Sequence, residues 1–382
     1  MTGGKRVVLF TPYSPRQGGG AANLRSLIPH LDGFHVDWLY TAAHDQGFPG
    51  AICVGPPMAG GSLAHDLGRT VALWSRVPTR RLRATVAALR AHPADGYWVV
   101  GHNEGVLVAR ALARLGAPVH LTIQDDVPDG MMARSTRYRY LAALARPTYY
   151  AALRQVRSLD FTSDGMKRYY AAALGLDGEV IHPFVPALLP PAAPPARPPG
   201  QLVVGHLGTI YAAAEWRAFL AALVGLARRR GLVPRMIMVG LAAKYRAVAA
   251  EFPGVVELVA DLPEDEAVAR LAAADVLYAM YPFDARADVF RRTSLPTKLS
   301  SYLRCRRPIV AHAPRDTSLG DIVERYGLGQ KCDSLSPPAI EAAIAAALDA
   351  SVPDARFETA REEVYGRVNV RRMAACLTAL CA

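Results

Sequence analysis

Cysteine is scarce in this sequence, and its spacing excludes the common cysteine-based scaffolds. Five cysteines occur in 382 residues, and no two of them form a CxxC pair. We therefore expect neither a disulfide framework nor a structural zinc site, and we predict no metal. Long apolar runs are also missing, since no stretch approaches the roughly 20 apolar residues that span a bilayer. No leader with a cleavage site precedes the apolar residues 7–10, so we expect a cytoplasmic protein.

Acidic residues are in short supply. The chain has 44 Lys and Arg against 33 Asp and Glu, a formal net charge of +11. A basic balance favours an anionic partner. Residues 131–159 contain six arginines and no acid. The alternatives for this segment are a solvated helix face over core tyrosines and a surface for an anionic membrane, a phosphorylated acceptor or a nucleic-acid backbone. The membrane interpretation would place the protein at the inner face of that membrane. Nucleic acid is less favoured, because no RRM, KH or zinc-finger signature occurs.

Short apolar runs alternate with helical patterns in both halves of the chain. The expected strands are residues 7–10, 36–39, 97–100, 119–123, 159–162 and 180–182, then 202–205, 235–239, 255–258, 276–279 and 309–312. Alternation of this kind predicts parallel sheets, because parallel strands need crossover connections. The fold class is therefore α/β, with two Rossmann-like doubly wound domains facing a cleft.

A proline-rich stretch separates the two halves. Repeated prolines fix φ and remove amide donors, so residues 187–200 are predicted to be a linker. The N-terminal domain then covers residues 1–186 and the C-terminal domain covers residues 201–353. Residues 354–382 form a long helical pattern that either caps the second domain or returns to the first.

Each half opens with a strand followed by a glycine-containing turn. Gly18, Gly19 and Gly20 follow the first strand, and Gly208 and Thr209 follow the first strand of the second half. Glycines at such a turn allow a ligand to approach the backbone, and the next helix N-terminus attracts anions. The alternative at both places is a simple turn between a strand and a helix.

The most specific segment lies near residue 298. Ser294 and Thr297 are small hydroxyl residues around Pro296, a pattern typical of a helix start. Lys298 then falls in the first helical turn, where the helix dipole disfavours a cation. A lysine at this position is easier to explain if it meets an anion.

Residues 296–311 read PTKLSSYLRCRRPIVA and follow an Ala-Asp-Val strand start at residues 274–276. This sequence resembles the nucleotide-sugar domain of family-4-like GT-B glycosyltransferases, whose recurring pattern is P-x-K-x-x-E-Y-L-A-x-G-x-P-V-V-A. The first half resembles the same family through the glycines at 18–20, Gln124-Asp125-Asp126 in place of "HD", and the "S-x-x-M" pattern at residues 163–166. The resemblance covers nearly the whole chain in the correct order.

The resemblance implies a hexosyltransferase-type enzyme that moves a sugar from a nucleotide-sugar donor to a hydroxyl acceptor with retention. It implies no metal and no cofactor besides the donor, and the acceptor is a small molecule, a glycan or a lipid-linked compound. The implied donor-binding residues are Gly208, Thr209, Ser294, Thr297, Lys298 and Ser301. The implied acceptor-binding residues are Gly18, Gly19, Gly20, His102 and Gln124.

Catalytic roles are assigned to His102, Asp125 and Lys298. His102 and Asp125 follow predicted strands, and a histidine there contacts the sugar or acts as a base because its pKa lies near neutrality. The alternatives are a hydrogen-bonded loop histidine and an aspartate that caps a helix or pairs with an arginine.

The sequence departs from the family at two glutamates, which are Thr293 and Ser301 here. A serine hydroxyl accepts hydrogen bonds more weakly than a carboxylate. Two other functions therefore stay open, a catalytically impaired protein that binds nucleotide sugars and a sugar-nucleotide epimerase of GT-B shape.

Overall fold

The computed structural model describes residues 4–16, 18–45, 47–57, 71, 74, 79–102, 104–188 and 199–382. The chain divides into two units. Unit 1 comprises Met1–Phe184, Arg286–Ser294 and Arg367–Ala382, and unit 2 comprises Val185–Ala285 and Leu295–Gly366. The chain therefore passes from one unit to the other four times. Most of the linker predicted over residues 187–200 lies outside the described residues.

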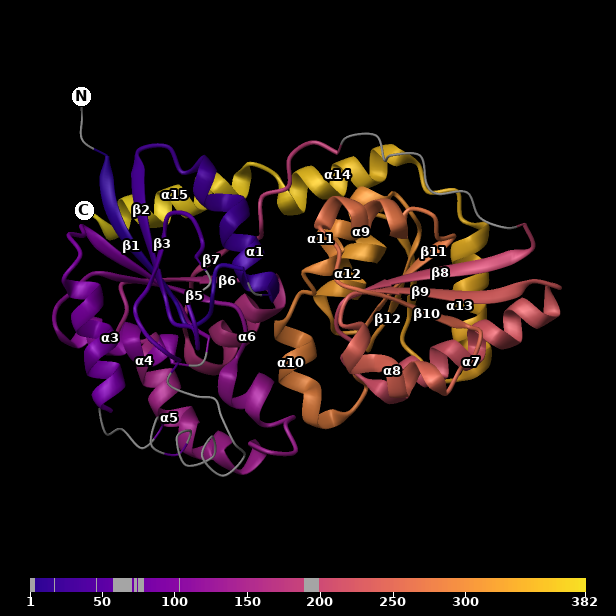
Figure 1. Cartoon of the computed structure of the whole chain (residues 1–382), viewed down its shortest axis with the longest axis horizontal. Helices are drawn as coiled ribbons and strands as arrows, with labels where there is room; N and C mark the ends of the chain where they lie inside the picture. Colours follow the sequence, from indigo (N-terminus) through magenta and orange to yellow (C-terminus); the bar gives the residue numbers. More distant parts are fainter. Residues whose placement is uncertain are drawn as a thin grey trace. The chain divides into compact units, whose positions relative to one another are not determined.

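Unit 1 is built on a seven-stranded sheet in the order β3-β2-β1-β4-β5-β6-β7, in which neighbouring strands run parallel (Figure 1). Its strands are β1 (Lys5–Thr11), β2 (Phe34–Tyr40), β3 (Ala51–Cys53), β4 (Gly96–Val100), β5 (Val119–Ile123), β6 (Ser158–Phe161) and β7 (Glu179–Val180). Its helices include α1 (Gly18–Leu27), α3 (Arg80–Arg90), α4 (Gly105–Arg114), α5 (Ala142–Leu153), α6 (Asp164–Leu174), α10 (Asp288–Thr293) and α15 (Val368–Leu380).

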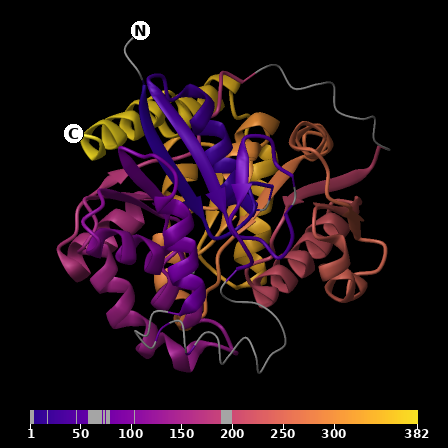
Figure 2. The same cartoon turned by 60° about the vertical axis from the view of Figure 1, so that its left-hand side comes forward.

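Strand β1 shows how both faces of this sheet are covered. Val8 and Phe10 pack in a core with residues of α3, α4 and α5, whereas Val7 and Leu9 pack with α1 and α15. All four side chains are fully buried, and burial of each contributes about 1.5–3 kcal/mol. The last helix of the chain, drawn in yellow, thus lies beside the first strands (Figure 1, Figure 2).

Unit 2 has a six-stranded parallel sheet in the order β10-β9-β8-β11-β12-β13. Its strands are β8 (Gln201–Leu207), β9 (Val233–Val239), β10 (Val256–Val259), β11 (Val276–Met280), β12 (Ile309–His312) and β13 (Gly329–Cys332). Its helices are α7 (Ala213–Arg229), α8 (Ala242–Ala250), α9 (Glu264–Leu271), α11 (Lys298–Cys305), α12 (Ser318–Arg325), α13 (Pro337–Asp349) and α14 (Asp354–Tyr365). Leu202 and Val204 of β8 pack with α7, α8 and α13.

Several details differ from the sequence expectation, which included neither β3 nor β13. Gly18, Gly19 and Gly20 form the first turn of α1 rather than a loop before it. The C-terminal pattern is two helices, because the chain becomes extended at Gly366: α14 stays in unit 2 and α15 covers unit 1. The segment Arg286–Ser294, which contains α10, belongs to unit 1 although its neighbours in sequence belong to unit 2.

In each sheet the strand order reverses at one point, between β1 and β4 in unit 1 and between β8 and β11 in unit 2. Open parallel sheets bind ligands beyond the carboxyl ends of the strands at such a point, because the connections diverge to opposite faces. The reversal points therefore indicate where to look for a site in each unit.

Candidate active site

Lys298 lies at the reversal point of unit 2. Helix α11 begins at this residue, whose side chain is buried, with 6% of the residue exposed. Its ammonium Nζ donates a hydrogen bond to the backbone carbonyl of Thr209 (2.9 Å) and lies 3.3 Å from Nε2 of His206. Lys298 thus connects the start of α11 to the loop that follows β8.

Both ring nitrogens of His206 have polar neighbours. Its Nδ1 lies 3.0 Å from the carbonyl oxygen of Tyr278, whereas its Nε2 lies 3.3 Å from the carbonyl oxygen of Thr209 and 3.3 Å from the Lys298 ammonium. Because Nε2 faces a donor as well as a carbonyl, we assign the proton of the neutral ring to Nδ1. Nε2 is then left with a lone pair, which accepts a hydrogen bond from Lys298. Burial, followed by the nearby charge of Lys298, holds the pKa of His206 well below its ordinary value. His206 is therefore neutral and serves as an acceptor for the lysine.

The charge on Lys298 is not balanced by a carboxylate in the part of the chain that the structure describes. Burial lowers the pKa of its ammonium group to about 7. The ring of Tyr211 lies 5.0 Å from Nζ and supplies a weak cation–π contact. A buried ammonium group without an acidic partner is costly, and an anion placed beside it would remove that cost.

Two further features at this end of the sheet suit an anion. Gly208 has a φ of +68°, a conformation that favours glycine, at the turn after β8. Helix α7 then begins after Ala212, which provides no side-chain cap. Its first amide groups and its dipole therefore favour a negatively charged ligand.

Ser301 lies one turn after Lys298 on α11, next to a carboxylate from another helix. Its hydroxyl donates to Oε1 of Glu264 (3.2 Å), the first residue of α9. Arg304 pairs with the same oxygen at 3.2 Å. The sequence analysis did not single out Glu264, because only the packing of α9 against α11 brings it to Ser301.

Thr297 and Ser294 do not play the capping role expected of them. Thr297 occupies the N-cap position of α11 but its side chain makes no capping hydrogen bond. Ser294 ends α10 and belongs to unit 1, whereas Lys298 belongs to unit 2. Thr293 donates its hydroxyl to the carbonyl of Val289 within its own helix, which makes it a poor replacement for a glutamate.

In unit 1, Gly20 lies next to Gln124. A Cβ atom built on Gly20 would overlap the side-chain amide of Gln124, so a larger residue at this place would displace that side chain. The hydroxyl of Tyr13 donates to Oε1 of Gln124 (2.8 Å). The structure therefore brings together the two predicted acceptor-binding elements, and it adds Tyr13, which the sequence analysis missed.

His102 and Asp125 face each other beyond the ends of β4 and β5. Nδ1 of His102 lies 3.9 Å from Oδ2 of Asp125, and its ring meets the Tyr13 ring edge-on at 6.0 Å. Burial lowers the pKa of His102, an effect that the Asp125 charge opposes. Burial raises the pKa of Asp125, and His102, Arg134 and Ser294 lower it. Such a pair can accept and hold one proton.

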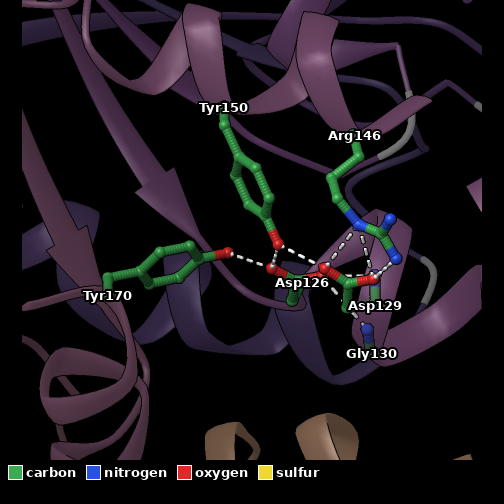
Figure 3. Close-up of polar contacts among 6 residues, drawn as sticks. All are labelled: Asp126, Asp129, Gly130, Arg146, Tyr150 and Tyr170. Atoms are coloured by element: carbon green, nitrogen blue, oxygen red, sulfur yellow. Dashed lines mark hydrogen bonds and ion pairs between the residues drawn. The ribbon is translucent and has the colours of Figure 1, made fainter. Parts of the chain in front are cut away.

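Asp126 has a structural role that differs from that of Asp125. Its Oδ1 accepts from the backbone amides of Asp129 (2.7 Å) and Gly130 (3.0 Å), and its Oδ2 accepts from the hydroxyl of Tyr170 (2.7 Å) (Figure 3). Asp129 in turn pairs with Arg146 of α5. These bonds cap the turn Val127–Met132, which follows directly after Asp126.

Helix α10 packs against unit 1 near Asp125. The guanidinium group of Arg134 stacks 3.7 Å from the centre of the Phe290 ring. The hydroxyl of Ser163 donates to the carbonyl of Thr293 (2.5 Å). These contacts place Ser294 beside Asp125, where it lowers the pKa of that carboxyl.

Metal and membrane features were sought in the described residues. No group of three or more His, Cys, Asp or Glu side chains there is arranged to hold a metal ion. None of the described helices has the length and apolar character needed to cross a bilayer.

Comparison by sequence finds no matching family model and no matching curated protein. Comparison of structures finds WaaG, a glycosyltransferase involved in lipopolysaccharide biosynthesis, at 15% identity and a TM-score of 0.64, covering 97% of this chain and 99% of that chain. The spinosyn rhamnosyltransferase SpnG complexed with thymidine diphosphate matches at 13% identity and a TM-score of 0.54, covering 98% and 99%. A putative UDP-N-acetylglucosamine 2-epimerase from Listeria monocytogenes matches at 12% identity and 0.58, covering 98% and 96%. The prediction of two Rossmann-like domains is confirmed, and the chain has a GT-B glycosyltransferase-like fold.

Proposed function

We propose that this protein is a glycosyltransferase that moves a sugar from a nucleotide-sugar donor to a hydroxyl acceptor. The observation that carries the proposal is Lys298, a buried cation at the reversal point of unit 2 with no carboxylate partner among the described residues. A donor diphosphate would supply the negative charge that this position lacks. The structural likeness to glycosyltransferases, one of them complexed with thymidine diphosphate, supports the same assignment.

The diphosphate is assigned to Lys298, Gly208 and Thr209 at the end of β8 and the starts of α7 and α11. When the bond between the anomeric carbon and the phosphate oxygen breaks, the leaving phosphate gains negative charge. A cation already held in place by Thr209 and His206 stabilises that charge without rearrangement. Lys298 therefore acts in the proposed reaction by electrostatic stabilisation of the leaving group.

The donor nucleoside is assigned to the neighbourhood of Ser301. Its hydroxyl is already bonded to the Glu264 carboxylate, whose side chain is 59% exposed. Glu264 supplies near this position the negative charge that the family resemblance leads one to expect at residue 301. Thr297 lies at the start of the same helix and completes the proposed donor side.

The acceptor hydroxyl is assigned to unit 1, beside Gly20, Gln124 and His102. The His102–Asp125 pair orients this hydroxyl, and its neutral imidazole is able to take the hydroxyl proton. Transfer forms the bond from the acceptor oxygen to the anomeric carbon, and the proton leaves with the phosphate or passes to His102. Retention of configuration remains the expectation from the family resemblance.

Binding and turnover of a panel of nucleotide sugars test the proposal. We expect one or more nucleotide sugars to bind, with the Lys298 charge strengthening their binding. We also expect sugar transfer when a hydroxyl acceptor is supplied. The variant Lys298→Met should weaken donor binding, whereas the matched variant Lys331→Met should not, because Lys331 pairs with Glu324 on another part of unit 2. Failure of every nucleotide sugar to bind at millimolar concentration would contradict the proposal.

The same panel of nucleotide sugars distinguishes the two alternative functions, an epimerase and a binding protein without turnover. An epimerase, suggested by the Listeria neighbour, would interconvert donor sugars without an acceptor in an NMR time course. A binding protein without turnover, suggested by the side chains at Thr293 and Ser301, would bind the donor and leave it unchanged with every acceptor. NMR of the product anomeric proton decides between retention and inversion.

A further inference from the structure

Helix α5 is apolar on two opposite faces. Its inner face, which includes Ala145, Tyr149 and Ala152, is buried in the core of unit 1. The outer positions of α5 and of the short helical turn before it carry exposed apolar residues at a spacing of i, i+3, i+4 and i+7. These four residues, here called the outer stripe, are Tyr140, Ala143, Leu144 and Pro147. A helix with apolar residues on both faces is expected to bury both, so the outer stripe calls for a partner.

The exposure of the outer stripe is substantial. Tyr140 is 75% exposed, the largest value among the exposed large apolar residues of the described chain, and Leu144 is 38% exposed. Tyrosine, with an apolar ring and a polar hydroxyl, suits a boundary between water and an apolar phase.

Positive charge surrounds the outer stripe. Arg137, Arg139 and Arg154 are exposed around it, and Arg139 stacks against the Tyr140 ring at 4.6 Å. Arg146 of the same helix remains half exposed while it pairs with Asp129 (Figure 3). Residues 131–159 themselves contain no Asp or Glu.

We propose that the outer stripe and its flanking arginines dock on an anionic lipid membrane. An apolar strip bordered by arginines matches the apolar boundary and the phosphate headgroups of such a surface at the same time. A nucleic-acid backbone would use the arginines but would leave Leu144 and Pro147 without a role. The inference does not depend on the reaction proposed above, because these residues lie outside the groups assigned to donor and acceptor.

Sedimentation with lipid vesicles tests this docking surface. The full-length protein should sediment with vesicles of equal parts phosphatidylcholine and phosphatidylglycerol, and much less with phosphatidylcholine alone. One basic side chain near an anionic membrane changes the partition constant about fivefold, so Arg137→Gln/Arg139→Gln should weaken binding by about 25-fold. The control Arg228→Gln/Arg246→Gln removes the same charge from exposed positions in unit 2 and should retain binding.

The apolar contribution is tested separately. Leu144→Ser should weaken vesicle binding with the charge unchanged, whereas Leu335→Ser, at a residue 44% exposed in unit 2, should not. Thermal unfolding of each variant checks that the fold is kept. Equal binding to charged and uncharged vesicles, absence of binding to both, or equal losses in the two arginine variants would overturn the proposal. Salt-sensitive binding of DNA or RNA through Arg137 and Arg139 without vesicle binding would also overturn it.

Discussion

Donor affinity should weaken as the pH rises above about 7, because Lys298 loses its proton in this range. In the free protein the pKa of its ammonium group is lowered to about 7, so at about pH 8 only about one molecule in ten carries the charge. An anion binds the charged form, and the apparent affinity falls in proportion to the fraction that is competent. Affinity should therefore weaken about 16-fold between about pH 7 and about pH 8.5.

Isothermal titration with a nucleotide sugar measures this effect, because a diphosphate esterified at both ends does not itself titrate in that range. Repeating the titration in buffers with different ionisation enthalpies should show an uptake of about 0.9 proton at about pH 8. Lys298→Met should lose the pH slope and the proton uptake, and should bind about 10- to 150-fold more weakly, as expected for loss of a charge-assisted hydrogen bond. An identical slope in the wild type and in Lys298→Met would refute the reasoning.

The lowered pKa of Lys298 also predicts how the stability of the ligand-free protein depends on pH. Because the folded value lies below the ordinary 10.5, the unfolded chain binds more protons between about pH 7 and 10.5. The free energy of unfolding should therefore rise with pH across this window, by up to ~5 kcal/mol from this group. Urea unfolding of wild type and Lys298→Met should diverge as pH changes, and a constant difference between them would show that the lysine is not desolvated.

Three further predictions concern unit 1. Tyr170→Phe removes a hydrogen bond to the buried Asp126 carboxylate and should cost about 1.5–3 kcal/mol in urea unfolding; a cost below about 0.5 kcal/mol would contradict the role of that bond. Gly20→Ala should displace the side chain of Gln124 and raise the acceptor KM while donor affinity is kept, and an unchanged acceptor KM would remove Gln124 from the acceptor site. Because burial lowers the pKa of His102 below 6.5, the rate of transfer at saturating donor should rise with pH through a pKa below that value and then level off; a similar profile in His102→Gln would exclude His102 as the group responsible.

The parallel sheets could be predicted from the sequence, because strands that are covered on both faces appear as continuous apolar runs, such as Val7 to Phe10 and Val276 to Met280. It also pointed to Lys298, because a cation in the first turn of a helix conflicts with the helix dipole. Strand β13 was missed because its sequence, Gly-Gln-Lys-Cys, has no apolar run and is defined by pairing with β12.

The remaining site residues depend on contacts between distant parts of the chain. Nothing near Glu264 in sequence indicates that its carboxylate meets Ser301, 37 residues later. Tyr13 and Gln124 are 111 residues apart and meet only because β1 and β5 belong to the same sheet. Ser294 was assigned to the donor side because it is close to Lys298 in sequence, and nothing in the sequence indicates that α10 ends in unit 1, where the Ser294 side chain lowers the pKa of Asp125.

The excursion of Arg286–Ser294 into unit 1 has a consequence for protein engineering. A chimera joined at one point after Phe184 would combine an N-terminal portion from one parent with an α10 and an α15 from the other. Phe290 of one parent would then have to stack on Arg134 of the other, and α15 would have to pack on a sheet from a different parent, so both contacts would be mismatched. An exchange of unit 1 between related proteins should therefore transplant three pieces together, residues 1–184, 286–294 and 367–382, so that each unit keeps its own packing partners.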